Sequence, residues 1–171
     1  VWQSAATVES IIRGDLLEKA AEAGLRSLFV GFETFSSENL KQSNKKQNLA
    51  YSYEKAVKRL HDLGIMINGS FVFGLDNDDK DVFSRTVEWG VKNAITTATY
   101  HILTPYPGTK LYEDLKAQNR IESQNWDLYD TRHAVYTPKN MSKEEIEAGY
   151  IKAYKDFYSW KNIVRSSFNH D

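Results

Sequence analysis

The sequence predicts an α/β fold built on a parallel sheet. Short apolar runs with the pattern of buried strands occur at residues 1–6, 27–32, 65–75 and 97–103. Segments with apolar residues at helical spacing lie between them, at residues 16–23, 51–63 and 82–91. Strand and helix alternate at spacings of roughly 30 residues, which is typical of βαβ units and a parallel sheet. Ligands of such sheets bind at the carboxyl ends of the strands.

Composition narrows the function classes. The 171 residues are enough for one domain with a sizeable core. A formal net charge of −1 favours neither nucleic acid nor an anionic membrane as a partner. No apolar run approaches the roughly 20 residues that cross a bilayer. No secretory signal is visible, so we expect a cytoplasmic location. The absence of cysteine excludes disulfides, thiolate metal sites and a cysteine nucleophile.

The pattern changes beyond residue 110. A helix to about residue 117 is followed by an aperiodic stretch, and Ser142 with Glu145 forms a capping box that begins another helix. We therefore divide the chain into residues 1–118 and an extension, residues 119–171, with an amphipathic helix at about 143–160. Its aromatic stripe either packs on its own domain or binds a partner.

Several polar residues on the predicted strands or in the segments that follow them are candidates for a site, each with an ordinary structural alternative. Glu33 follows a buried strand and is either a ligand contact at the mouth of the sheet or a charge near a helix start. Ser70 either lines a cavity or bonds its own backbone. Lys45 lies in a polar run that is typical of a solvated loop. His101 either faces the interior or is a satisfied core histidine.

Three other sequence patterns do not identify a metal or ligand site. Residues 76–81 resemble the start of a calcium loop, but Asp81 occupies the place of the required glycine. The four histidines lack metal-ligand spacing, so we predict no metal site. The turn at residues 104–109, with two prolines and Gly108, is expected to be rigid, although rigidity identifies no ligand.

Taken in order, six segments resemble the core of one enzyme family. They are residues 20–24 (AAEAG), 29–34 (FVGFET), 44–45 (NK), 60–65 (LHDLGI), 69–76 (GSFVFGLD) and 103–109 (LTPYPGT). Their order and spacing resemble the radical S-adenosylmethionine (SAM) superfamily. The branch they resemble most carries a cobalamin-binding domain and includes the anaerobic magnesium-protoporphyrin ester cyclase type.

The resemblance implies a fold and a set of roles. It implies a partial TIM-type barrel: about four parallel βα units, the second half (strands three to six) of a radical SAM (β/α)₆ core, with a C-terminal helical extension. A C-x-x-x-C-x-x-C loop in the first half would hold a [4Fe–4S] cluster, at which SAM is cleaved reductively. By this comparison Glu33 contacts SAM, and Lys45 pairs with its carboxylate. Ser70 lies near the ribose, and Leu103 lies near the adenine.

Because no cysteine is present, we expect the chain to be a piece of a longer enzyme that uses SAM, a [4Fe–4S] cluster and possibly cobalamin. Alone it is expected to be inactive and to hold no cofactor firmly, and the substrate stays unknown. The alternative is a non-catalytic α/β binding or scaffold module that uses its aromatic C-terminal helix. A half barrel also leaves a sheet edge without its partner, which predicts an edge-paired homodimer.

Overall fold

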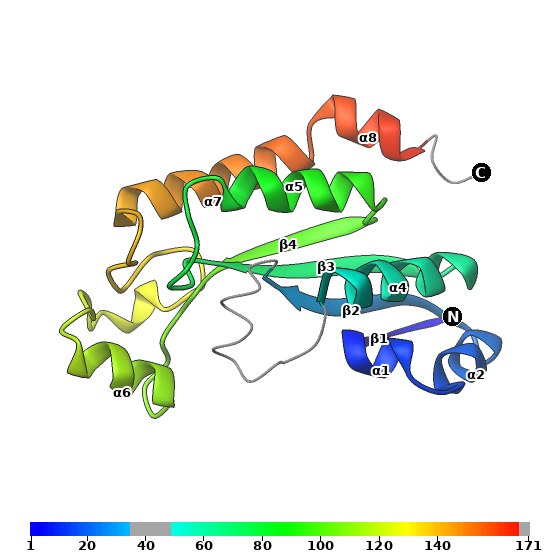
Figure 1. The fold of residues 1–171 in the computed structure, drawn as a ribbon, viewed down its shortest axis with the longest axis horizontal. Helices are drawn as coiled ribbons and strands as arrows, with labels where there is room; N and C mark the ends of the chain where they lie inside the picture. Colours follow the sequence, from blue (N-terminus) through cyan, green and yellow to red (C-terminus); the bar gives the residue numbers. More distant parts are fainter. Residues whose placement is uncertain (35–48, 168–171) are drawn as a thin grey trace.

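The computed structural model describes residues 1–34 and 49–167, and it confirms the predicted α/β class (Figure 1). Four parallel strands form one sheet in the order β1-β2-β3-β4. They are β1 (Trp2–Thr7), β2 (Leu25–Glu33), β3 (Met66–Phe73) and β4 (Thr97–Ile102). All three pairings are parallel, so the carboxyl ends of the strands lie at the same edge of the sheet.

The helices follow the predicted periodicity, with two differences. They are α1 (Val8–Ile12), α2 (Leu16–Glu22), α4 (Leu49–Asp62), α5 (Val82–Lys92), α6 (Lys110–Ala117), the 3₁₀ turn η1 (Trp126–Leu128), α7 (Lys143–Phe157) and α8 (Trp160–Ser167). The short α1 was not predicted; its first turn is capped by the Thr7 hydroxyl, which accepts from the Ser10 N–H at 3.2 Å. In the region where one helix was predicted at about 143–160, α7 ends at Phe157 and a second helix, α8, begins at Trp160.

One face of the sheet forms the core. Alternate residues of the inner strands β2 and β3 and of the edge strand β4 are buried, as expected for a sheet that helices cover on one side. Phe32, Phe71 and Tyr100 lie on this face and stack across the strands, with ring centroids 5.7 Å apart in each neighbouring pair. Helices α4, α5 and α7 pack over them, and α5 and α7 run side by side (Figure 1).

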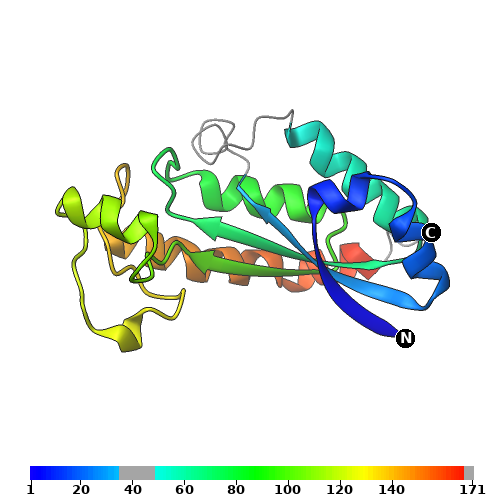
Figure 2. The same cartoon turned by 90° about the horizontal axis from the view of Figure 1, so that it is seen from below.

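The opposite face carries polar and partly exposed side chains. Asn68 and Ser70 of β3 and Thr99 and His101 of β4 alternate with the buried residues and therefore point away from the core. The Thr99 hydroxyl donates to the Asn68 side-chain oxygen at 3.2 Å. Figure 2 shows the strands from this direction. In a closed barrel this face would line the interior.

Strand β4 is an edge strand, and α7 covers its edge. The Tyr154 hydroxyl accepts from Tyr100 N–H at 3.0 Å, and the Tyr158 hydroxyl accepts from Ala98 N–H at 3.0 Å. Farther along, Ile102 N–H donates to the Thr131 carbonyl at 2.7 Å. The edge of β4 is therefore covered, because side chains of the extension satisfy its outward-facing groups. The edge-paired homodimer stays a prediction, for which β1 supplies the other edge.

The extension shares the core of the sheet. Ile146, Ala153 and Phe157 of α7 belong to the same buried cluster as β2 and β3. The division at residue 118 stays a prediction. Among the helices of the described ranges, none is both long enough and apolar enough to cross a membrane.

Candidate functional site

Glu33 ends β2 in an unusual backbone conformation. Its φ is 61°, and the Thr34 N–H donates to the Phe32 carbonyl at 2.8 Å. A hydrogen bond from residue i+2 to residue i defines a γ-turn, and a positive φ at its centre marks the rarer and strained kind. The pairing register between β2 and β3 shifts at the same place, between Gly31 and Glu33. The turn carries an exposed carboxylate at the mouth of the sheet.

The Glu33 side chain folds back over Gly31. A Cβ atom on Gly31 would lie 3.9 Å from the Glu33 Oε1, an ordinary van der Waals separation, so the carboxylate lies over this glycine. Gly31 pairs with Ser70 of β3, whose half-buried side chain is on the open face. Neighbouring strands are separated by about 4.8 Å. The structure thus brings two predicted site residues, Glu33 and Ser70, to adjacent strands of the same face.

The other two predicted residues have different outcomes. Leu103 follows β4 and is half-buried; its N–H donates to the Phe73 carbonyl at 2.9 Å, which extends the pairing of β3 and β4. It lies at the same carboxyl edge as Glu33 but two strands away. Lys45, together with the polar run around it, lies outside the described residues.

A second strained residue lies at this mouth. Four described non-glycine residues have a positive φ, and two of them, Ala94 and Asn119, directly follow the ends of α5 and α6, where such a conformation is ordinary. The others are Glu33 and Thr131, and Thr131 has a φ of 67°. A β-branched residue in this region is a genuine outlier. Strain of this kind is found preferentially at functional sites.

Thr131 orients His101. Its hydroxyl lies 3.2 Å from the His101 Nδ1, while its carbonyl accepts from Ile102 N–H. Burial lowers the pKa of His101, so the imidazole is neutral at pH 7. The structure therefore places His101 on the open face of the sheet, where the Thr131 hydroxyl is its hydrogen-bond partner.

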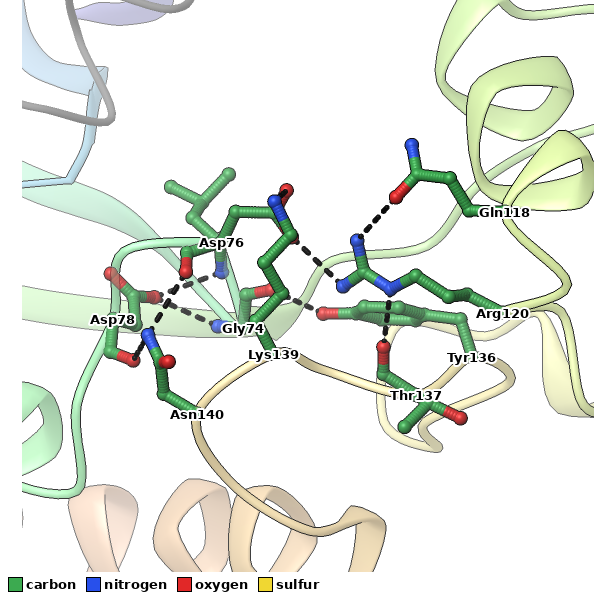
Figure 3. A network of polar contacts seen from close by, with 10 residues as sticks. Gly74, Asp76, Asp78, Gln118, Arg120, Tyr136, Thr137, Lys139 and Asn140 are labelled. Atoms are coloured by element: carbon green, nitrogen blue, oxygen red, sulfur yellow. Dashed lines mark hydrogen bonds and ion pairs between the residues drawn. The ribbon is translucent and has the colours of Figure 1, made fainter.

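A polar network that the sequence did not reveal anchors the turn after β3 (Figure 3). The buried Asp78 carboxylate accepts from the N–H groups of Gly74 and Leu75, at 2.9 and 3.0 Å. The Tyr136 hydroxyl donates to the Gly74 carbonyl. Asn140 donates to the carbonyls of Asp76 and Asp78. Residues 76–79 are thus a braced turn, and the described residues contain no group of three metal-ligating side chains.

Asp76 is the charged centre of this network. Arg120 and Lys139 bind its two oxygens at 2.8 and 2.7 Å. Burial alone would raise the pKa of Asp76, but the hydrogen bonds from Arg120 and Lys139 outweigh it and hold the pKa below its ordinary value. No sequence pattern paired Asp76 with its two cations, since both lie more than 40 residues away along the chain.

The chain resembles known proteins along nearly its whole length. It is 31% identical to the bacteriochlorophyllide d C-12(1)-methyltransferase of Chlorobaculum tepidum over 164 residues, which are 96% of this chain and 36% of that protein. It is 27% identical to the anaerobic magnesium-protoporphyrin IX monomethyl ester cyclase of Cereibacter sphaeroides over 149 residues, 87% of this chain and 24% of that protein. No profile of a known protein family matches the sequence.

The fold has a counterpart among solved structures. Coproporphyrinogen III oxidase from Escherichia coli, a radical SAM enzyme, superposes with a TM-score of 0.63 at 13% identity, over 96% of this chain and 32% of that one. The chain belongs to the radical SAM superfamily. This radical SAM chain spans between 22% and 36% of the length of the curated relatives it matches.

The residues of this radical SAM chain fit SAM, but they do not fit the iron–sulfur cluster. Without a cysteine it has no thiolates to hold an iron–sulfur cluster. SAM fits better: the exposed Glu33 carboxylate, at the carboxyl end of β2, offers acceptors for hydroxyl or ammonium groups. Ser70 adds a hydroxyl on the neighbouring strand.

Proposed function

We propose that this chain forms the SAM-facing wall of a larger radical SAM enzyme, whose [4Fe–4S] cluster is held by cysteines outside these residues. The observation that carries the proposal is the strained turn that sets the Glu33 carboxylate over Gly31, beside Ser70. SAM, when bound, supplies the radical that starts the reaction. The chain's part is to bind and orient SAM at the carboxyl ends of the strands.

Each predicted site residue has a chemical role in this proposal. Glu33 accepts hydrogen bonds from SAM, and Ser70 contributes its hydroxyl near the ribose. Lys45 pairs with the SAM carboxylate, and Leu103 gives an apolar contact near the adenine. Cobalamin stays a prediction of the resemblance, as does a cytoplasmic location.

The proposal is tested by SAM binding and cleavage. In the cluster-loaded protein that contains this chain, Glu33→Gln should weaken SAM binding about ten-fold, because a charge-assisted hydrogen bond is lost. Glu88→Gln, which changes an exposed carboxylate on α5, is the matched control. The 171-residue chain alone should release no 5′-deoxyadenosine under reducing conditions. Clear turnover by that chain, or equal affinities of the two variants, would contradict the proposal.

The names of two relatives support a tetrapyrrole as the substrate class, since one is a bacteriochlorophyllide methyltransferase and the other a magnesium-protoporphyrin ester cyclase. His101 is the residue of this chain that we propose to contact it, because its imidazole is neutral and held by the strained Thr131 on the open face. Titration of the parent protein with magnesium-protoporphyrin monomethyl ester, followed by absorbance, tests this contact. His101→Ala should weaken binding, and the exposed His133→Ala should not.

The alternative of a non-catalytic module is less well supported. That alternative needs the aromatic stripe of the C-terminal helix to bind a partner. However, the hydroxyls of Tyr154 and Tyr158 already form hydrogen bonds with main-chain groups at the edge of β4. Among the described aromatic residues of this region, Trp160 is the most exposed. A deoxyadenosine assay of the parent protein separates the two, because a scaffold module forms none.

A further inference from the structure

The turn at Glu33 cannot be maintained by its own sequence. Glu33 is not a glycine, yet its φ of 61° lies in the region that favours glycine. A γ-turn of this hand is rare because it is strained, so contacts from elsewhere must hold it. Without them, the chain would relax to the extended conformation of the preceding strand, which would point the carboxylate elsewhere.

Tyr53 of α4 supplies those contacts. Its hydroxyl donates to the Phe32 carbonyl, the acceptor of the γ-turn itself, and lies 3.3 Å from the Thr34 carbonyl. One side chain therefore touches the residues on both sides of Glu33. The α4 helix carries Tyr53 from a different part of the chain, 21 residues beyond Phe32.

The Tyr53 ring is itself held in place. It is 4% exposed and packs edge-on against Phe32, with centroids 5.1 Å apart and an interplanar angle of 76°. Trp89 of α5 lies against both rings, 6.1 Å from Tyr53 and 5.1 Å from Phe32. This aromatic contact leaves the hydroxyl little freedom, so it bonds the turn from a fixed position.

We propose that Tyr53 is a positioning residue for SAM binding: its hydroxyl holds the strained turn that keeps the Glu33 carboxylate over Gly31. The inference rests on the proposed function, since it assumes that Glu33 contacts SAM. Burial, and secondarily the charge of Glu33, raise the pKa of Tyr53, so its hydroxyl keeps its proton and remains a donor at any working pH.

The test is a double-mutant cycle read out by SAM affinity. SAM binding to the cluster-loaded parent protein is measured by equilibrium dialysis without a reductant, so that no cleavage occurs. Tyr53→Phe keeps the buried ring and removes only the hydroxyl. We expect it to raise the SAM dissociation constant about ten-fold, similar to Glu33→Gln. In the Glu33→Gln background, Tyr53→Phe should cause no further loss, because the two act through one contact.

A matched control separates positioning from general stability. Tyr154→Phe also removes a tyrosine hydroxyl that bonds main-chain groups, but at the edge of β4. It should lower the thermal midpoint as Tyr53→Phe does, and leave SAM affinity unchanged.

The outcomes distinguish the two levels of the proposal. Weakened binding in Glu33→Gln with normal binding in Tyr53→Phe would overturn the role of Tyr53 and keep that of Glu33. Losses that add in the double variant, or an equal loss in Tyr154→Phe, would also overturn the role of Tyr53. Normal affinity in Glu33→Gln would overturn the SAM contact itself, and the role of Tyr53 with it.

Discussion

The Tyr158 hydroxyl lies between the N–H and the C=O of Ala98, 3.0 Å from the nitrogen and 2.9 Å from the oxygen. One turn earlier, Tyr154 makes the same pair of contacts with Tyr100. A row of tyrosines at helical spacing thus replaces the strand that would otherwise pair with β4. A free edge is a template for association with other chains, and this row blocks it.

Removing these hydroxyls should weaken and expose the edge. Tyr154→Phe and Tyr158→Phe should each lower the free energy of unfolding by about 1 kcal/mol, since each loses a side-chain hydrogen bond to the backbone. The double variant should self-associate at concentrations where the natural protein does not. Urea unfolding and sedimentation velocity measure the two effects. A double variant with unchanged sedimentation would contradict the blocking role.

Tyr100→Phe should have the opposite effect on stability. Among the described residues, the Tyr100 hydroxyl is a buried side-chain group without a hydrogen-bond partner. Burial of an unpaired hydroxyl is unfavourable, so its removal should raise the free energy of unfolding by about 1 kcal/mol. Urea unfolding at pH 7 checks this, and a loss of stability would show that the hydroxyl has a favourable contact.

Gly74 is the glycine that the network of Figure 3 needs. A Cβ atom there would lie 2.3 Å from both the Ile146 Cδ1 and the Tyr136 hydroxyl, and φ is 94°. Gly74→Ala should therefore cost about 3 kcal/mol or more, from overpacking added to backbone strain. Gly108→Ala is the control, because φ is 81° there but no atom lies within 4 Å of the new Cβ. Its cost should be about 1 kcal/mol, from strain alone.

The ion pairs of Asp76 predict a dependence on pH. Because the folded pKa of Asp76 is lower than its ordinary value of 3.8, its stabilising contribution is present above that pH. It is lost as the pH falls through the folded pKa. Asp76→Asn should therefore be less stable than the natural protein at pH 7, and the difference should shrink below pH 3.8. Urea unfolding between pH 3 and 7 measures this, and a constant difference would rule out the ionised carboxylate as its cause.

Much of the fold could be predicted because its signals are local. The apolar run around Val30 indicated β2, and the helical spacing of Tyr53, Ala56 and Leu60 indicated α4. The short α1 was missed because five residues give too little periodicity.

The candidate site was predictable only in part. The rule for parallel sheets selected Glu33, and the family resemblance added Ser70; the two residues lie on adjacent strands. No local pattern indicated that Thr131 would hold His101, because 30 residues without a regular period separate them. The same holds for Arg120 and Asp76, which are 44 residues apart.

The sequence by itself determined the α/β class, the parallel direction of the strands and the absence of thiolate ligands. Hydrophobic periodicity and composition can be read directly from the sequence, so they do not depend on knowledge of the fold. Only the tertiary structure decided how Glu33 is oriented, what covers the edge of β4 and what braces the turn at Gly74. In each case a tyrosine hydroxyl bonds a main-chain group between 21 and 62 residues away, and such pairing depends on packing through space.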